Sequence, residues 1–172
     1  MRIRIGEHKK IIIDADVIIH FSKADQLGIL HTIYPNQIYL LDFVFKEVFM
    51  GNLKIQVENM IRFGFLQELE FNDDIKVLRE FALLKRKFGT GESACMAYCR
   101  FHDDVLASSN LKDIKKYCEQ HKIQYLTTMD FLLTAYDKGI LAESECDQFI
   151  TDVLSKGSKL PYTNIKKYIE SM

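Results

Sequence analysis

The sequence predicts an α/β protein, a three-layer α/β/α sandwich on a short, mainly parallel sheet. Short apolar runs alternate with longer amphipathic stretches along the chain, which is typical of parallel strands joined by helices. The first run, Lys10–Asp14, is apolar at consecutive positions, as expected of a strand covered on both faces. The 172 residues can bury a sizeable core, so we expect residues 1–172 to form a single domain.

The next elements follow from helix signals and from a proline. Val17–Ser22 begins a helix directly after the first strand. Asp25 is a suitable N-cap for a second helix over Gln26–Tyr34, which Pro35 would end. A second strand is then expected over Gln37–Leu41.

The middle of the chain is expected to hold two helices and a strand. Phe43–Met50 and Asn52–Phe63 are amphipathic, and Gly51 suits the end of the first of these helices. Phe65–Phe71 alternates apolar and acidic residues, which favours a strand.

The remaining part repeats the alternation. Asp73 or Asp74 can cap a long helix over Ile75–Phe88, whose last turn would hold three cations, and the sequence GTGE would end it. The further expected elements are the helix Glu92–Phe101, the strand Asp104–Ala107, the helix Leu111–His121, the strand Ile123–Leu126, and two or three closing helices, Met129–Lys138, Ser144–Leu154 and Asn164–Ser171. The domain core would span about residues 10–154, with a linker and the last helix in 155–172.

Composition narrows the function classes. A net charge of −1 gives no global basic field of the kind that marks many nucleic-acid binders. A local basic surface remains compatible with this sum: the lysines 112, 115, 116 and 122 and the run 85–87 could line an RNA path, or form a solvated surface. No apolar stretch reaches the roughly 18 residues of a membrane span. Four cysteines without a Cys-x-x-Cys pair favour buried thiols in a reducing cytoplasm.

Several acids stand at junctions between expected elements. Asp14 and Asp16 interrupt the apolar run IIIDADVIIHF, where Asp16 is well placed to cap a helix and Asp14 lies deeper toward the strand. Glu47 lies among phenylalanines, and Glu92 follows GTG at a helix start. Each has an ordinary alternative as a cap, a solvated acid or a partner of the helix dipole. Because ligands gather outside the carboxyl ends of parallel strands, these acids could converge there on a hard cation such as Mg²⁺.

Four short segments occur in the order found in one known family. IIIDADVII, VFKEVF, GTGESACMAYCRFHDDVLAS and IQYLTTMDFLLTAYDKGIL resemble segments of PIN-domain ribonucleases, over roughly Lys10 to Leu154. The resemblance implies hydrolysis of RNA phosphodiesters with Mg²⁺ or Mn²⁺. It would make Asp14, Glu47 and Glu92 metal ligands, with Asp16 as an accessory or capping acid. PIN proteins commonly act as toxins held by a small antitoxin, so such a partner is an expectation too.

The chain departs from the family at its fourth acidic position. The turn after Asp104–Ala107 reads Ser-Ser-Asn, with Asn110 as the closest match, and an amide supplies an oxygen but no negative charge. Ser109 and Asp113 are taken as accessory, although Asp113 also suits a helix's first turn. Two functions therefore stay open: a metal-dependent endoribonuclease, and a catalytically impaired module that binds RNA or a protein partner. A surplus of apolar side chains, including Phe43 and Phe45, could form a homodimer or partner surface.

Overall fold

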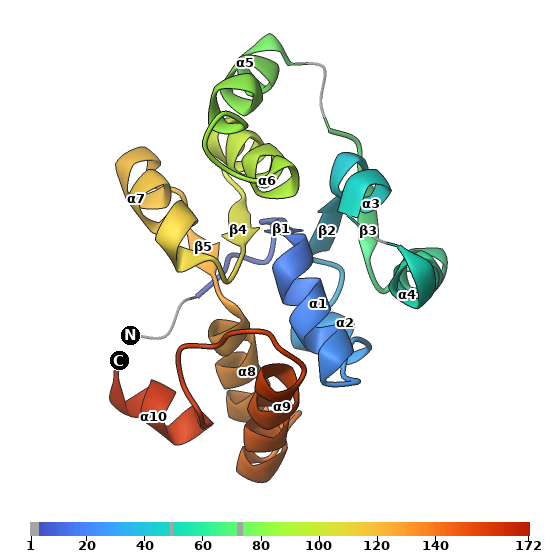
Figure 1. Ribbon diagram of the computed structural model, residues 1–172, viewed down its shortest axis with the longest axis vertical. Helices are drawn as coiled ribbons and strands as arrows, with labels where there is room; N and C mark the ends of the chain where they lie inside the picture. The colour runs from blue at the N-terminus through green and yellow to red at the C-terminus, as the bar shows by residue number, and fades with distance from the viewer. Residues whose placement is uncertain (1–3, 49, 72–73) are drawn as a thin grey trace.

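The computed structural model describes residues 4–48, 50–71 and 74–172, without the side chains of Glu47 and Val48 (Figure 1). Its centre is a five-stranded sheet with the order β3-β2-β1-β4-β5, in which every pair is parallel. The strands are β1 (Ile11–Ile13), β2 (Ile38–Leu41), β3 (Gln67–Leu69), β4 (Val105–Ala107) and β5 (Tyr125–Leu126). The predicted α/β class with a parallel sheet is confirmed.

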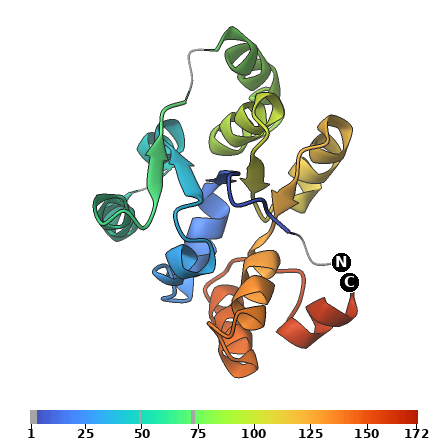
Figure 2. The ribbon, with the colours of Figure 1, turned by 180° about the vertical axis from the view of Figure 1, so that it is seen from behind.

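Helices cover both faces of the sheet (Figures 1 and 2). On one face lie α3 (Asp42–Val48), α5 (Ile75–Leu84), α6 (Thr90–Phe101) and α7 (Leu111–His121), and α6 contacts the other three. On the other face lie α1 (Ala15–Lys23), α2 (Ile29–Ile33), α8 (Thr128–Asp137) and α9 (Glu143–Ser155). The helix α10 (Ile165–Glu170) packs on α8 and α9, and α4 (Gly51–Arg62) lies near β3.

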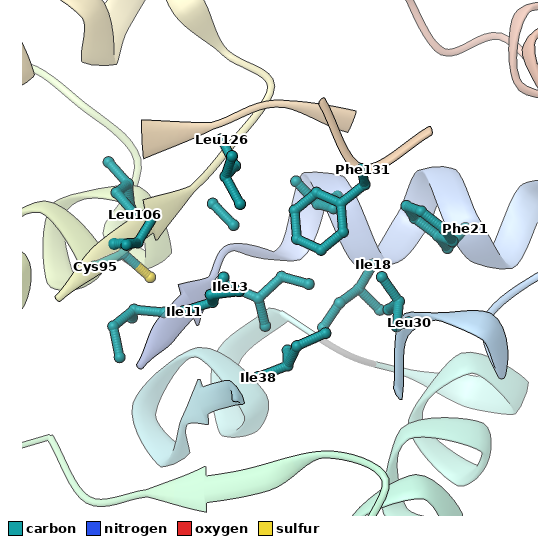
Figure 3. Packing of buried hydrophobic residues seen from close by; sticks show 14 of the residues in the cluster. Ile11, Ile13, Ile18, Phe21, Leu30, Ile38, Cys95, Leu106, Leu126 and Phe131 are labelled. Carbon is teal, nitrogen blue, oxygen red and sulfur yellow. The ribbon is translucent and has the colours of Figure 1, made fainter. Parts of the chain in front are cut away.

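The core surrounds β1, which lies between β2 and β4. All three isoleucines of this strand have no exposed surface, because helices cover both sides. Figure 3 shows Cys95 of α6 beside Leu106 on one side of β1, and Phe21 with Phe131 on the other. The Phe21 ring meets the rings of Phe131 and Phe149 edge to face, at centroid distances of 5.9 and 4.8 Å. Such pairs add to the hydrophobic stabilisation of the core.

Several predicted helix ends are wrong. The second helix starts at Ile29 and not at Gln26, because Asp25 has a left-handed backbone (φ 54) and lies in a turn instead of capping a helix. Gly51, expected at the end of the helix Phe43–Met50, is instead the first residue of α4, with φ 61. Asp74 caps α5 by accepting from the Lys76 amide at 2.8 Å. Asp73 lies outside the described residues.

The expectation that GTGE ends the long helix is wrong, because that helix ends before GTGE and the next helix begins within it. The helix α5 ends at Leu84, so the cations at 85–87 lie in the turn after it, and α6 begins at Thr90 within GTGE. A short turn is enough to connect α5 to α6, because the two helices pack against one another. Glu92 is therefore in the first turn of a helix whose N-cap is Gly89.

The expected apolar surplus, which besides Phe43 and Phe45 comprises Ile29, Leu30, Ile33, Phe49 and Met50, is exposed only in part, with Met50 at the surface. Leu30 and Ile33 are fully buried, and Phe43 packs against Phe71 and Phe81 at 5.6 and 5.2 Å between ring centroids. Phe49 lies outside the described residues. The large exposed apolar side chains are mainly on α4 and α5 and beside them, namely Met50, Ile55, Phe63, Phe65, Ile75, Leu78 and Leu83.

Candidate active site at the carboxyl ends of the central strands

The strand order places a crevice between β1 and β4. The chain builds β1, β2 and β3 in one direction and then returns to place β4 on the other side of β1. In open α/β sheets, ligands bind outside the carboxyl ends of the strands at such a switch point. Asp14 directly follows β1, and Ser108–Asn110 follow β4, so both segments lie at this edge. Asp103 and Asp104 precede β4 and lie at the opposite end of the strand.

Asp14 links the sheet to the first helix. Its amide donates to the carbonyl oxygen of Ala107 in β4 at 2.8 Å, which continues the strand pairing by one residue. Its side chain is the N-cap of α1 and accepts from the Ala15 amide at 2.8 Å. The predicted preference for Asp16 as the cap is therefore wrong. A single residue separates the end of the strand at Ile13 from the first helical residue, Ala15, which leaves Asp14 in the capping position.

Asp16 ties α1 to the turn that follows β4. Its Oδ1 accepts from the Val17 amide at 2.7 Å, and its Oδ2 accepts from the Ser109 amide at 2.8 Å and from the Ser108 hydroxyl at 3.3 Å. Both carboxylate oxygens are thus engaged by the protein. Asp16 fixes the position of the turn, which carries Asn110.

The Ser109 side chain joins a chain of polar contacts that continues to Thr128 and His20. Its Oγ lies 2.6 Å from Oγ1 of Thr128 and accepts from the Thr128 amide at 2.9 Å. Thr128 Oγ1 also lies 2.8 Å from Nδ1 of His20. Burial lowers the pKa of His20 to about 4, so the imidazole is neutral at pH 7. The sequence suggests none of these contacts.

Asn110 and Asp113 form a pair at the start of α7. Asn110 is the N-cap residue but its side chain does not cap the helix; its Nδ2 donates to Oδ2 of Asp113 at 2.8 Å. Asp113 lies in the first turn of the helix, where the dipole favours an acid. Asn110, the neutral residue at the fourth position, is thus hydrogen-bonded to Asp113 at the edge of the crevice.

Glu92 is the most distinctive acid of the group. It is 8% exposed, and its Oε1 is buried without a hydrogen-bond partner. Burial raises the pKa of Glu92 from 4.5 to about 8, with further contributions from Asp14, Asp113 and Asp16. A hydrogen bond from Asn110 opposes this rise only in part. Burial likewise raises the pKa of Asp14, and the charge of Asp16 raises it further.

These side chains line one cleft of about 530 Å³. Its walls come from the start of α1, the start of α6 and the start of α7. The lining residues are Asp14, Ala15, Asp16, Ile19, Gly89, Thr90, Gly91, Glu92, Asn110 and Asp113. Larger hollows lie elsewhere, one of them of about 880 Å³ between β5 and α10, but that hollow is mostly apolar and holds a single acid, Asp130.

The sequence of this chain matches the model of a known protein family. A family model described as a PIN domain matches residues 10–172. The chain belongs to the PIN-domain family. No curated protein and no solved structure matches this PIN domain.

Glu47 is the one predicted ligand that the geometry does not place. Its backbone belongs to α3, which contacts α6. Its side chain lies outside the described part of the structure, so its distance from Asp14 and Glu92 is not defined. Among the described residues, the acids of the cleft included, no three His, Cys, Asp or Glu side chains are close enough to hold a metal ion as they stand.

The donor atoms in the cleft of this PIN domain fit a hard divalent cation. Carboxylate and amide oxygens are the ligands that Mg²⁺ prefers, and two carboxylates with waters can suffice. The unpartnered Oε1 of Glu92 is an acceptor that the protein itself leaves unused. The charge of Asp14 raises the pKa of Glu92, and a bound cation would relieve that repulsion. The four cysteines are all buried, as the sequence predicts.

Proposed function

We propose that this PIN domain is a metal-dependent endoribonuclease that hydrolyses RNA phosphodiester bonds. The observation that carries the proposal is the buried, unpartnered carboxylate oxygen of Glu92 in a cleft that Asp14 also lines. Asp14, Glu47 and Glu92 would hold Mg²⁺ or Mn²⁺, and Asn110 would occupy the fourth place. When bound, the cation supplies Lewis acidity that activates water and stabilises charge on phosphoryl oxygens.

The protein's own groups would have separate tasks in this reaction. Asp14 is held in one orientation by the Ala15 amide, so little rearrangement is needed when it binds a cation. Asp16 is a positioning residue, because its two oxygens hold α1 and the turn after β4 at a fixed separation. Asp113 keeps the Asn110 amide at the mouth of the cleft, where it can donate to a substrate or a water molecule.

The test is cleavage of a panel of structured and single-stranded RNAs with Mn²⁺ or Mg²⁺. Asp14→Asn and Glu92→Gln should each reduce cleavage by roughly a hundredfold or more, since each loses a charged ligand. Asp103→Asn is the matched control, because Asp103 is exposed at the opposite end of β4 and bonds only to Lys9 among the contacts described. Cleavage that survives in both cleft variants, or that persists in EDTA, would contradict the proposal.

A second candidate is a catalytically impaired module that binds RNA or a protein partner. The favouring observation is Asn110, a neutral residue whose amide is engaged with Asp113. Asn110→Asp discriminates between the two functions. If the wild-type protein binds RNA without cutting it and this variant cuts, the impaired module is the correct assignment.

The cellular role proposed on the resemblance alone is that of a toxin restrained by a small antitoxin protein. Growth arrest on expression, absent in Asp14→Asn and relieved by a co-expressed neighbouring gene product, would support this role. Full growth on expression of a protein that cuts RNA in vitro would count against it.

Homodimerisation is a separate proposal, measured by sedimentation. No helix within the described ranges has the length and apolarity of a membrane span.

A further inference from the structure

The start of α6 is an uncapped helix end that opens into the acidic cleft. Gly89 is the N-cap residue, and no side chain caps the helix. The first helical bond joins the Ser93 amide to the Gly89 carbonyl oxygen at 2.9 Å. The amide groups of Thr90, Gly91 and Glu92 come before it and have no partner within the helix. Such amides, together with the helix dipole, attract anions.

The glycine is not required by space or by backbone geometry. A Cβ atom built on Gly89 would meet no heavy atom within 4 Å, and its backbone angles (φ −60, ψ 156) suit any residue. Asp, Asn or Ser would fit at this position and would cap the helix, as these residues are preferred there. A side chain of this kind would occupy the amides, whereas glycine leaves them available to a ligand.

Glu92 indicates independently that a ligand enters here. Its carboxylate is more than nine-tenths buried and lines the same cleft as Gly89 and Thr90, yet its Oε1 has no partner. An unpaired buried acceptor is costly unless a cation or a donor reaches it. Because the floor of the cleft is acidic, a free anion would be repelled, but an anion that shares a cation with Glu92 would not.

Positive side chains lead toward this point on the surface. Lys85, Arg86 and Lys87 are exposed in the turn between α5 and α6, directly before Phe88 and Gly89. Lys112 is exposed on the first turn of α7, beside Asn110. Exposed cations next in sequence to two segments that line an acidic cleft suit a phosphodiester chain that binds there, since its charges need neutralising outside the metal site.

We propose that the amides at the start of α6 bind a non-bridging oxygen of a substrate phosphate group, next to the cation held by Glu92. The inference rests on the proposed function and names the subsite that receives the phosphate. Gly89 is then a specificity position, because it keeps the amides of Thr90 and Gly91 free.

The experiment places a competing cap on these amides. Gly89→Asn supplies a neutral cap and should raise the melting temperature measured in EDTA, whereas Gly89→Asp supplies a charged cap that the acids of the cleft oppose. Ala142→Asn is the matched control, because Ala142 is the exposed N-cap of α9 and makes no side-chain cap. Binding of a fluorescent single-stranded RNA is measured by anisotropy with Ca²⁺, and RNA integrity is checked on a gel.

We expect Gly89→Asn to weaken RNA binding by roughly tenfold, since hydrogen bonds to a charged group are lost. Gly89→Asp should weaken binding further by repulsion, and Ala142→Asn should leave it unchanged. Wild-type affinity in a Gly89→Asn protein that has become more thermostable would overturn the inference and leave the nuclease proposal standing. Failure of Gly89→Asn to raise the melting temperature would overturn it as well, since the amides would not be free. A wild-type protein that neither binds nor cuts RNA would overturn both proposals.

Discussion

Glu92→Gln should make the metal-free protein more stable at pH 8. The pKa of Glu92 is raised from 4.5 to about 8, so at pH 8 the folded protein carries a charge that burial and neighbouring acids disfavour. A rise of this size would correspond to about 5 kcal/mol of unfolding free energy if nothing screened the charge. The cleft admits solvent to part of the carboxylate, so we expect about 2 kcal/mol from the substitution.

The sign follows from which state holds the proton. Between about pH 4.5 and pH 8 the unfolded chain has lost the proton that folded Glu92 retains, so raising the pH lowers stability across this window. The penalty is absent below pH 4.5 and complete above pH 8. The glutamine variant lacks this titration, and its advantage over the wild-type protein should grow as the pH rises.

Urea denaturation in EDTA from pH 5 to about pH 9 measures both effects. Glu145→Gln is the matched control, because Glu145 is the third residue of α9, as Glu92 is of α6, but is exposed and accepts from the Ala142 amide at 2.7 Å. This control should be slightly less stable than the wild-type protein. Equal pH dependence of the Glu92→Gln and wild-type proteins, or a loss of stability at pH 8, would refute the reasoning.

Three further outcomes are expected. The His20 imidazole should stay neutral until about pH 4, so stability falls as the pH drops from 6.5 through that value; NMR titration of its ring protons reports this. Phe21→Ala should cost about 3–5 kcal/mol of unfolding free energy in urea titrations, because a core ring is lost from two aromatic contacts. Tyr168→Phe should loosen α10, because the Tyr168 hydroxyl donates to Oδ1 of buried Asp130 at 2.5 Å; faster amide exchange confined to 165–170 checks it.

The sheet was predictable because its signals are local and strong. Apolar runs such as Ile11–Ile13 can only be stabilised when both faces are covered, and the alternation with helices then fixes a parallel sheet. The position of Asp14 follows from the same reasoning, since an acid at the end of a buried strand must lie at the edge of the sheet. Helix Leu111–His121 was predicted with its observed bounds for a similar reason, a clear amphipathic pattern.

The predictions that were wrong or missing depend on single backbone angles and on contacts between residues far apart in the sequence. The left-handed conformation of Asp25 shortens α2, and no neighbouring residue gives a sequence signal for this conformation. Asp14 caps the helix instead of Asp16 because the helix starts two positions earlier than expected. The Ser109–Thr128 contact spans 19 residues and leaves no local pattern. One missed feature did have a signal: Thr127 and Asp130 form a capping box, which places the start of α8 at Thr128.

The bond between Asp16 and the Ser109 amide joins groups 93 residues apart in the chain. The cleft is therefore a property of the completed sheet, since its parts come together only when β4 pairs with β1. A ribosome synthesising this protein therefore carries no assembled cleft until β4 has emerged, and a chain that ends before that strand lacks one wall of the cleft.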